Sequence, residues 1–278
     1  MAADLKTQPP PSDSFLLSYP ATHVLLLTIN RPKARNSIHY QAHWDADAIL
    51  NWFDGEPSLR VAIITGAGPT AFCAGQDLIE QAQIRANPPP APLRRHPPSG
   101  FAGISRRAGK KPIIAAVNGF ALGGGFEICL NCDIVIASPT ASFGLPEVTV
   151  GLYAAAGGLP RIARIAGLQI ASEIALTGRR LTPQEALSYH LINSISSSPE
   201  TVISDAVKMA TRIASVNPDA VIITKAGLRE AWETGSVEEA ARRTSERFDR
   251  ALAEGENMMI GLEAFAAKKV PKWVPSKM

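Results

Sequence analysis

The sequence Pro112-Ile-Ile-Ala-Ala-Val-Asn-Gly-Phe-Ala-Leu-Gly-Gly-Gly-Phe-Glu127 places three glycines and an acid directly after an apolar run. The run 112–118 is typical of a buried strand, and the glycine turn leads into a helix predicted from about Gly124 to Leu130. Backbone N–H groups at a helix start can hold a developing negative charge. A second acid follows in Gly144-Leu-Pro-Glu147. An anion cradle beside two acids is what moving a proton next to a carbonyl group requires.

The glycine cluster also has two simpler interpretations. A tight strand-to-helix turn needs one or two glycines, and a dinucleotide site needs Gly-x-Gly-x-x-Gly, which this stretch does not contain. Three consecutive glycines instead indicate a close approach of the backbone to a ligand. Ala74-Gly75, which follows a strand predicted at 61–65, could supply a second backbone donor. Taken alone, an ordinary turn is the simpler explanation of that pair.

Composition excludes several classes of function. The chain has 278 residues, 46% of them hydrophobic and 19% charged, which predicts a globular protein with a sizeable core. The net charge of +3 gives no argument for a nucleic-acid partner. No apolar run approaches the roughly 20 residues that span a bilayer. Cys129-x-x-Cys132 lacks the second pair that a metal site needs, so no metal is expected. His39 and His43 are expected on a helix surface.

The chain divides into three parts by pattern. Residues 1–14 are polar and proline-rich and are expected to form a disordered leader. Strand and helix patterns alternate over 15–197, which predicts an α/β domain with largely parallel strands, interrupted by a proline-rich loop at 87–100. Residues 198–278 are expected to form a helical appendage that packs partly on a partner subunit, with packing on its own core as the alternative. Its helices are predicted at about 199–215, 218–233, 237–253 and 257–268.

Six motifs give the chain a resemblance to the crotonase, or enoyl-CoA hydratase/isomerase, superfamily from about Leu25 to the C-terminus. They occur in the order seen in that family, and they are Asn30-Arg-Pro-Lys-Ala-Arg-Asn36, Ala71-Phe-Cys-Ala-Gly-Gln-Asp77, the stretch 112–127, Asn131-Cys-Asp133, Phe143-Gly-Leu-Pro-Glu147 and Leu176-Thr-Gly-Arg-Arg180. The resemblance implies a spiral core of ββα turns and a C-terminal helical trimerisation region, in homotrimers or hexamers. It implies an acyl-CoA thioester as substrate, with coenzyme A carried on the substrate and no separate cofactor.

The resemblance also implies a catalytic role for each acid. The thioester oxygen would accept hydrogen bonds from the N–H groups of Ala74 and Gly124. Glu127 would orient and deprotonate water, and Glu147 would deliver a proton to the α-carbon. Hydratases of the family keep both acids, so the chain is expected to add water reversibly and with syn geometry to a 2-enoyl-CoA. Two carboxyl groups in one site tend to split their pKa values, which would leave one protonated and one ionised.

Further contacts to the substrate and its coenzyme A portion are implied for nine residues: Lys33, Arg35, Gly75, Gln76, Asp77, Leu78, Gly123, Lys268 and Lys269. The alternative for each lysine is a solvated surface charge. Three departures from the short-chain members of the family leave the length and branching of the acyl chain open. They are the proline-rich segment 87–98, Leu145, and Tyr153-Ala-Ala-Ala-Gly157.

Alternatives to the hydratase function are enoyl-CoA isomerisation, dehydration of a 3-hydroxyacyl-CoA in a peroxisomal secondary pathway, and a non-catalytic acyl-CoA-binding trimer. The chain ends in Ser276-Lys277-Met278, which resembles the peroxisomal address Ser-Lys-Leu. The peroxisome is therefore the expected location, with its import receptor as a further partner. A chance basic tail on a cytoplasmic protein is the alternative.

Overall fold

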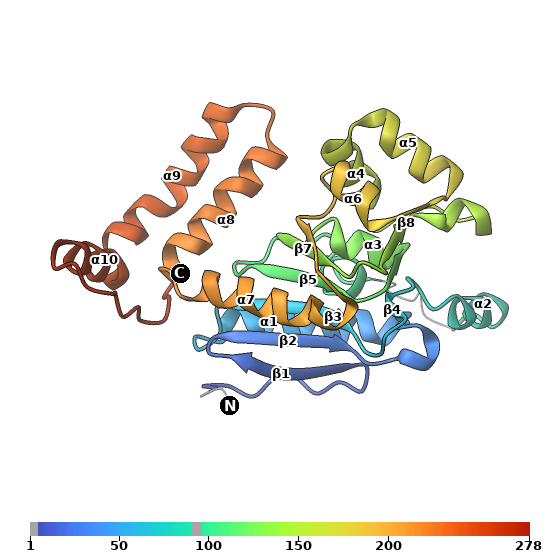
Figure 1. Ribbon diagram of the computed structural model, residues 1–278, viewed down its shortest axis with the longest axis horizontal. Coiled ribbons are helices and arrows are strands. Elements are labelled where there is room, and N and C mark those ends of the chain that lie inside the picture. The colour runs from blue at the N-terminus through green and yellow to red at the C-terminus, as the bar shows by residue number, and fades with distance from the viewer. Residues whose placement is uncertain (1–4, 90–95) are drawn as a thin grey trace.

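The strands form two sheets in the computed structural model, which describes residues 5–89 and 96–278 (Figure 1). The larger sheet has the order β1 (Phe15–Ala21), β2 (Val24–Ile29), β3 (Val61–Gly66), β5 (Ile113–Val117), β7 (Ile134–Ala137) and β10 (Ser194–Ile195). Only its β1–β2 pair is antiparallel among the described strands. The smaller sheet has the order β4 (Ala71–Cys73), β6 (Phe120–Leu122), β8 (Ser142–Gly144) and β9 (Arg180–Leu181).

A strand–strand–helix unit repeats along the core. The repeats are β3, β4 and α2 (Leu78–Ala86); β5, β6 and α3 (Gly124–Cys129); and β7, β8 and α4 (Gly158–Ala166). Each repeat gives its first strand to the larger sheet and its second to the smaller one. Neighbouring repeats pair in parallel in both sheets, so the chain winds as a spiral. This confirms the expected α/β spiral of ββα turns.

Alternating side chains divide the interior into two cores. In β3, Ala62 and Ile64 belong to the main core, which includes α1 (Tyr40–Gly55). Val61 and Ile63 belong to a second core on the other face of the sheet, because successive strand residues point to opposite faces. That second face is covered by α7 (Val202–Ala214), which buries four small apolar residues at helical spacing: Val202, Ala206, Ala210 and Ala214.

The position of α7 corrects the predicted boundary at residues 197 and 198. Because α7 seals one face of the larger sheet, it is part of the core, and the projecting region begins at α8 (Pro218–Glu233). Figure 1 shows α8 and α9 (Val237–Ala253) side by side as a pair that extends away from the sheets, followed by α10 (Glu256–Ala266). The helix positions agree with the predicted ones within a few residues. The remaining helices are α5 (Leu168–Thr177), α6 (Pro183–Ser188) and 3₁₀ turns at 32–34, 101–103, 146–150 and 199–201.

The projecting region leaves large apolar side chains exposed. Leu228 on α8 is 70% exposed and Phe265 on α10 is 86% exposed. A groove between α8 and the core adds Ile165 and Trp232 to this apolar surface. Within residues 5–89 and 96–278, no helix is both long enough and apolar enough to cross a bilayer.

The N-terminal segment differs from the expected disordered leader over its described part, residues 5–14. The backbone N–H groups of Lys6 and Thr7 donate to the carboxylate of Glu56 at 3.1 and 2.8 Å. The indole N–H of Trp52 donates to the hydroxyl of Thr7 at 2.8 Å. The polar composition of this segment is therefore explained by the hydrogen bonds that it makes with α1 and with the C-terminal end of that helix. Residues 1–4 of the predicted leader lie outside the described residues.

Candidate active site

Both predicted acids line one pocket of about 470 Å³, whose lining also includes residues of α2 and of the segment 149–156. Glu127 comes from α3, and Glu147 comes from the 3₁₀ turn at 146–150. The spiral brings them together because β6 and β8 are paired neighbours, so the segments that follow them leave the same edge of the smaller sheet. The pocket wall also contains the predicted residues Ala74, Gly75, Gln76, Leu78, Gly123 and Gly124.

Glu127 is buried, with 3% of its surface exposed. Its Oε1 accepts a hydrogen bond of 2.8 Å from the N–H of Gly158, the first residue of α4. Burial raises the pKa of Glu127 to about 7, the Gly158 N–H opposes this rise, and the charge of nearby Glu147 adds to it. The residue can therefore both release and take up a proton near neutral pH.

Glu147 lies beside the glycine turn. A Cβ added at Gly123 would lie 3.2 Å from its Oε1. Its Oε2 is buried and has no hydrogen-bond partner among the described residues. Burial also raises the pKa of Glu147. Burial thus raises the pKa values of both acids above the usual value for a glutamate.

The three glycines have separate structural reasons. Gly123 has a φ of +54°, which favours glycine. A Cβ at Gly124 would lie 2.5 Å from the ring of Phe101, and one at Gly125 would lie 2.1 Å from the carbonyl oxygen of Cys73. The close approach predicted for this turn is therefore made, at Gly124 and Gly125, to other parts of the protein.

The structure corrects the prediction that the N–H of Ala74 is an oxyanion-hole donor. Its N–H donates to the carbonyl oxygen of Arg35 at 3.1 Å, so this donor is already used. The N–H of Gly75 faces the sulfur of Cys73 at 3.4 Å, and that of Asp77 donates to Ile38. The N–H of Gln76 donates to no described residue, and Gln76 lines the pocket. The motif alone does not reveal this difference, because only tertiary contacts show which N–H group is occupied.

The N–H of the second predicted donor, Gly124, donates to no described residue. Gly124 is the first residue of α3, where a backbone N–H has no partner within the helix. The turn that holds Gln76 packs directly against it, since a Cβ at Gly75 would lie 3.4 Å from the nitrogen of Gly124. Gln76 and Gly124 therefore offer two neighbouring backbone donors to one pocket.

Asp77 supports this turn from outside the pocket. Its carboxylate caps the N-terminus of α2 by accepting from Ile79 and Glu80. It also pairs with Arg31 at 3.0 Å, which joins the first family-like motif to the second. Asp77 does not line the pocket, so we assign it the structural role of supporting this turn.

The four predicted cations do not line the pocket. Lys33 and Arg35 are exposed on the loop that precedes α1, and the carbonyl of Arg35 contacts the Ala74 N–H. Lys268 and Lys269 are exposed just after α10. Figure 1 shows α10 on the opposite side of the molecule from α2 and β8. Within one chain, the structure does not bring these two lysines to the acids.

Sequence reasoning missed His43, which was expected on a helix surface. The structure buries it completely, on the face of α1 that points to the core. Its Nε2 is 2.9 Å from Oε1 of Gln76, and its Nδ1 accepts from the N–H of Ala102 at 3.0 Å. The ring of Phe101 packs at 4.6 Å from its centroid. The spacing of His43 from Ala46 and Leu50 on one helical face was a usable signal of burial.

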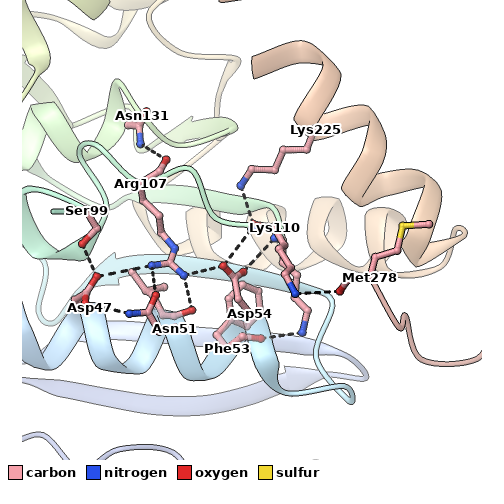
Figure 2. Close-up of polar contacts among 12 residues, drawn as sticks. Asp47, Asn51, Phe53, Asp54, Ser99, Arg107, Lys110, Asn131, Lys225 and Met278 are labelled. Atoms are coloured by element: carbon pink, nitrogen blue, oxygen red, sulfur yellow. Dashed lines mark hydrogen bonds and ion pairs between the residues drawn. The ribbon is translucent and has the colours of Figure 1, made fainter. Parts of the chain in front are cut away.

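A polar cluster holds the Phe101 wall against α1 (Figure 2). Arg107, whose side chain is 7% exposed, donates to Asp54 at 2.7 Å and to Asn51 at 2.9 Å. Asp47 accepts from the hydroxyl of Ser99. These bonds tie the segment 99–107 to the length of α1, so that Phe101 is fixed over Gly124.

Two further predictions concern groups outside the pocket. Cys129 and Cys132 are free thiols, and burial raises the pKa of each. Across the described residues, no three His, Cys, Asp or Glu side chains are grouped as metal ligands. Arg94 and Arg95 of the proline-rich loop lie outside the described residues.

Comparisons with known proteins agree with this geometry. The family model for enoyl-CoA hydratase/isomerase matches residues 21–275. The chain is 45% identical to a mevalonyl-coenzyme A hydratase of Aspergillus fumigatus, covering 95% of this chain and 96% of that protein. It is 37% identical to a carnitinyl-CoA dehydratase of Escherichia coli K12, covering 90% and 94%.

Solved structures lead to the same group of proteins. The crystal structure of an enoyl-CoA hydratase from Mycobacterium tuberculosis superimposes with a TM-score of 0.84 at 32% identity, covering 95% of this chain and 100% of that one. The matched spiral of ββα turns, with its helical C-terminal region, is the crotonase fold. This chain belongs to the enoyl-CoA hydratase/isomerase family of the crotonase superfamily.

Proposed function

We propose that this protein is a CoA-thioester hydratase that adds water reversibly to a 2-enoyl-CoA, and that also runs the reverse dehydration. The observation that carries the proposal is the joint placement of Glu127 and Glu147 in one pocket with two backbone N–H groups that donate to no described residue. The family supports a lyase acting on CoA thioesters at this level of detail.

The first step of the proposed reaction is polarisation of the thioester carbonyl. The N–H groups of Gln76 and Gly124 would donate to its oxygen, where negative charge grows as the enolate-like transition state forms. Donors held by the fold need no reorganisation during the reaction, and removing one such donor typically costs about 3–4 kcal/mol of stabilisation.

The second step is the addition of water across the double bond. One acid would orient water and take its proton as the oxygen attacks the β-carbon, and the other would give a proton to the α-carbon. As in the sequence-based hypothesis, Glu127 is proposed to handle the water and Glu147 the α-proton. The pKa of Glu127, raised to about 7, suits a group that must accept a proton in one direction and return it in the other.

We propose mevalonyl-CoA and its dehydrated product as the first substrate pair to test. The support is the 45% identity to a mevalonyl-coenzyme A hydratase over nearly the whole of both chains. Carnitinyl-CoA is the second pair to test, because the carnitinyl-CoA dehydratases are 37–38% identical. Mevalonyl and carnitinyl groups are both short acyl groups with a polar substituent, in contrast to a long alkyl chain.

The test is a direct assay with purified protein and synthetic thioesters. Hydration removes the conjugation of the 2-enoyl thioester, so its ultraviolet absorbance falls as the reaction proceeds. The expected result is turnover of at least one of the two pairs, with the same equilibrium reached from either side. No absorbance change with either pair, or with crotonyl-CoA as a short-chain standard, would contradict the proposal.

We further propose that the working unit is a homotrimer or hexamer. The exposed apolar side chains of α8 and α10, including Leu228 and Phe265, support burial against other subunits. Such an assembly would also allow Lys268 and Lys269 to approach the coenzyme A bound by a neighbouring copy. Light scattering at micromolar concentration distinguishes this from a monomer.

Peroxisomal import is proposed from the C-terminal Ser276-Lys277-Met278 alone. In the single chain this tail lies along the protein surface: Lys277 pairs with Glu256, and Lys110 donates to the terminal residue Met278 at 3.0 Å (Figure 2). Recognition by an import receptor would require release of these two contacts.

A further inference from the structure

The wall of the pocket at Gln76 contains a side-chain amide that the proposed reaction does not use. Oε1 of Gln76 is bonded to His43, but its Nε2 is buried and donates to no described residue. Leaving a buried amide N–H without an acceptor destabilises the fold, so native proteins rarely keep one without a reason. Gln76 also lines the pocket that holds the two acids.

His43 fixes the orientation of this amide. Its Nδ1 accepts from the N–H of Ala102, so the ring proton must be on Nε2, which then donates to Oε1 of Gln76. Burial lowers the pKa of His43 to about 3, which keeps the ring neutral and preserves this tautomer at physiological pH. Because Oε1 is committed to His43, the NH₂ group of Gln76 is the part left to meet a ligand.

Polar and apolar side chains both line the pocket. The polar ones include Tyr40, Gln81 and His96, and the segment 150–156 contributes apolar ones such as Val150 and Leu152. A plain alkyl chain would satisfy only the apolar side chains. It would leave the Gln76 amide desolvated and without an acceptor.

We propose that the Gln76 amide, held by His43, donates a hydrogen bond to a hydroxyl oxygen on the acyl chain, so that the substrate class is a hydroxylated short-chain enoyl-CoA. This inference rests on the proposed hydratase function and narrows it. Gln76 then serves twice, through its backbone N–H at the thioester and through its side chain at the acyl group. His43 is a positioning residue, since it acts only through Gln76.

A neutral hydroxyl fits this position better than a carboxylate. The amide is a neutral donor, and the neighbouring histidine that orients it is also neutral. Glu127 and Glu147 share the pocket, and a third carboxylate beside them would be repelled. Arg85 lines the same pocket but is exposed on α2, so its charge is screened by solvent.

The experiment compares three enoyl-CoA thioesters on the wild-type protein: dehydrated mevalonyl-CoA, which keeps its terminal hydroxyl; the same chain with hydrogen in place of that hydroxyl; and the chain ending in a carboxylate. The expected kcat/KM for the hydroxylated thioester is about ten- to a hundred-fold above that of the deoxy thioester. Equal values for the two, or a preference for the carboxylate, would overturn the inference. Failure of all three would instead overturn the hydratase function.

A variant then assigns the preference to Gln76. Gln76→Met keeps the length of the side chain and the backbone N–H but removes the amide, so the hydroxyl preference should fall to within about threefold of unity. The readout is the ratio of kcat/KM between the hydroxylated and the deoxy thioester, because a general loss of folding or of the oxyanion hole would lower both values together and leave their ratio unchanged. Gln83→Met, on the exposed side of α2, is the matched control and should keep the wild-type ratio.

His43→Phe tests the positioning role. The ring volume is kept, but the donor to Gln76 is lost, so the amide can turn and the preference for the hydroxylated thioester should drop at least fivefold, while crotonyl-CoA turnover changes less. An unchanged ratio in both Gln76→Met and His43→Phe would show that the hydroxyl preference arises elsewhere in the pocket.

Discussion

Glu127 and Gly158 are joined by a hydrogen bond of 2.8 Å, in which the first N–H of α4 donates to the buried carboxyl group of α3. The bond holds the carboxyl in one orientation and aims the positive end of α4 at it. Even so, burial dominates and raises the pKa of Glu127 to about 7. Gly158 has to be glycine, because a Cβ there would lie 2.7 Å from Cγ of Glu127.

The acids provide the first prediction. Glu127→Gln and Glu147→Gln should each lower kcat at least about 100-fold, which is the range of general acid–base catalysis, with little change in KM. Steady-state kinetics on the best thioester from the substrate screen measures this. Glu200→Gln, a surface substitution outside the pocket, is the control. Near-normal turnover in either pocket variant would remove that acid from the mechanism.

The pH dependence of stability is the second prediction. The pKa of Glu127 rises from 4.5 in the unfolded chain to about 7 in the fold, so between these values the folded state binds the extra proton. Stability from this group is therefore present below pH 4.5 and declines as the pH rises towards 7, by on the order of 3 kcal/mol. Glu127→Gln lacks this loss, so its Tm should gain on the wild type between pH 5 and pH 8. A constant Tm difference would contradict the raised pKa.

The backbone donor at Gly124 gives the third prediction. Gly124→Pro removes the N–H at a helix position where proline is tolerated, but any Cβ there meets the ring of Phe101 at 2.5 Å. We therefore make both Gly124→Pro and Gly124→Ala in a Phe101→Ala background. The alanine variant keeps the donor and should be at least about 100-fold more active. Circular dichroism checks that both variants are folded. If the folded variants are equally active, the hydrogen bond from the Gly124 N–H to the thioester oxygen is excluded.

The C-terminal region gives the fourth prediction, through two truncations. Ending the chain at residue 216 keeps α7 on the larger sheet and should give a soluble protein of smaller assembly size. Ending it at residue 198 removes α7, exposes the second core and should give insoluble protein. Light scattering and solubility measure this. Equal solubility of the two would show that α7 is not needed to cover the sheet.

The lysines after α10 give the fifth prediction. Lys268→Ala with Lys269→Ala should weaken binding of coenzyme A several-fold, and the difference should shrink at high salt because exposed charges are screened. Titration calorimetry at two ionic strengths measures this. Lys208→Ala is the control, since Lys208 is an exposed lysine on α7 paired with Asp205. Unchanged affinity at low salt would remove both lysines from the site.

The sequence patterns alone determined the α/β class and the positions of several elements, whereas the spiral of ββα turns and the shared site of the two acids were implied by the resemblance to the family. Apolar runs such as 112–118 predicted buried strands, and the three glycines before Glu127 predicted a close approach of the backbone to a ligand. The structure shows that Gly124 and Gly125 instead approach other parts of the protein. The helices after residue 198 were predicted from the sequence, and in the structure the side chain of Ser236 caps the start of α9. These features are local, since each depends on residues within one or two turns of the chain, and so they can be recognised in sequence.

Only the tertiary structure decided which groups in the pocket are free to act. The N–H of Ala74 is occupied by Arg35, which leaves Gln76 as the donor, and no local pattern reveals that contact. His43 lies within the core because α1 turns that face towards Gln76 and Phe101. The pKa of Glu127 likewise depends on burial by segments distant in sequence. Hydrogen-bond occupancy and desolvation are properties of packed neighbours, and packing brings these neighbours together only when the chain has folded.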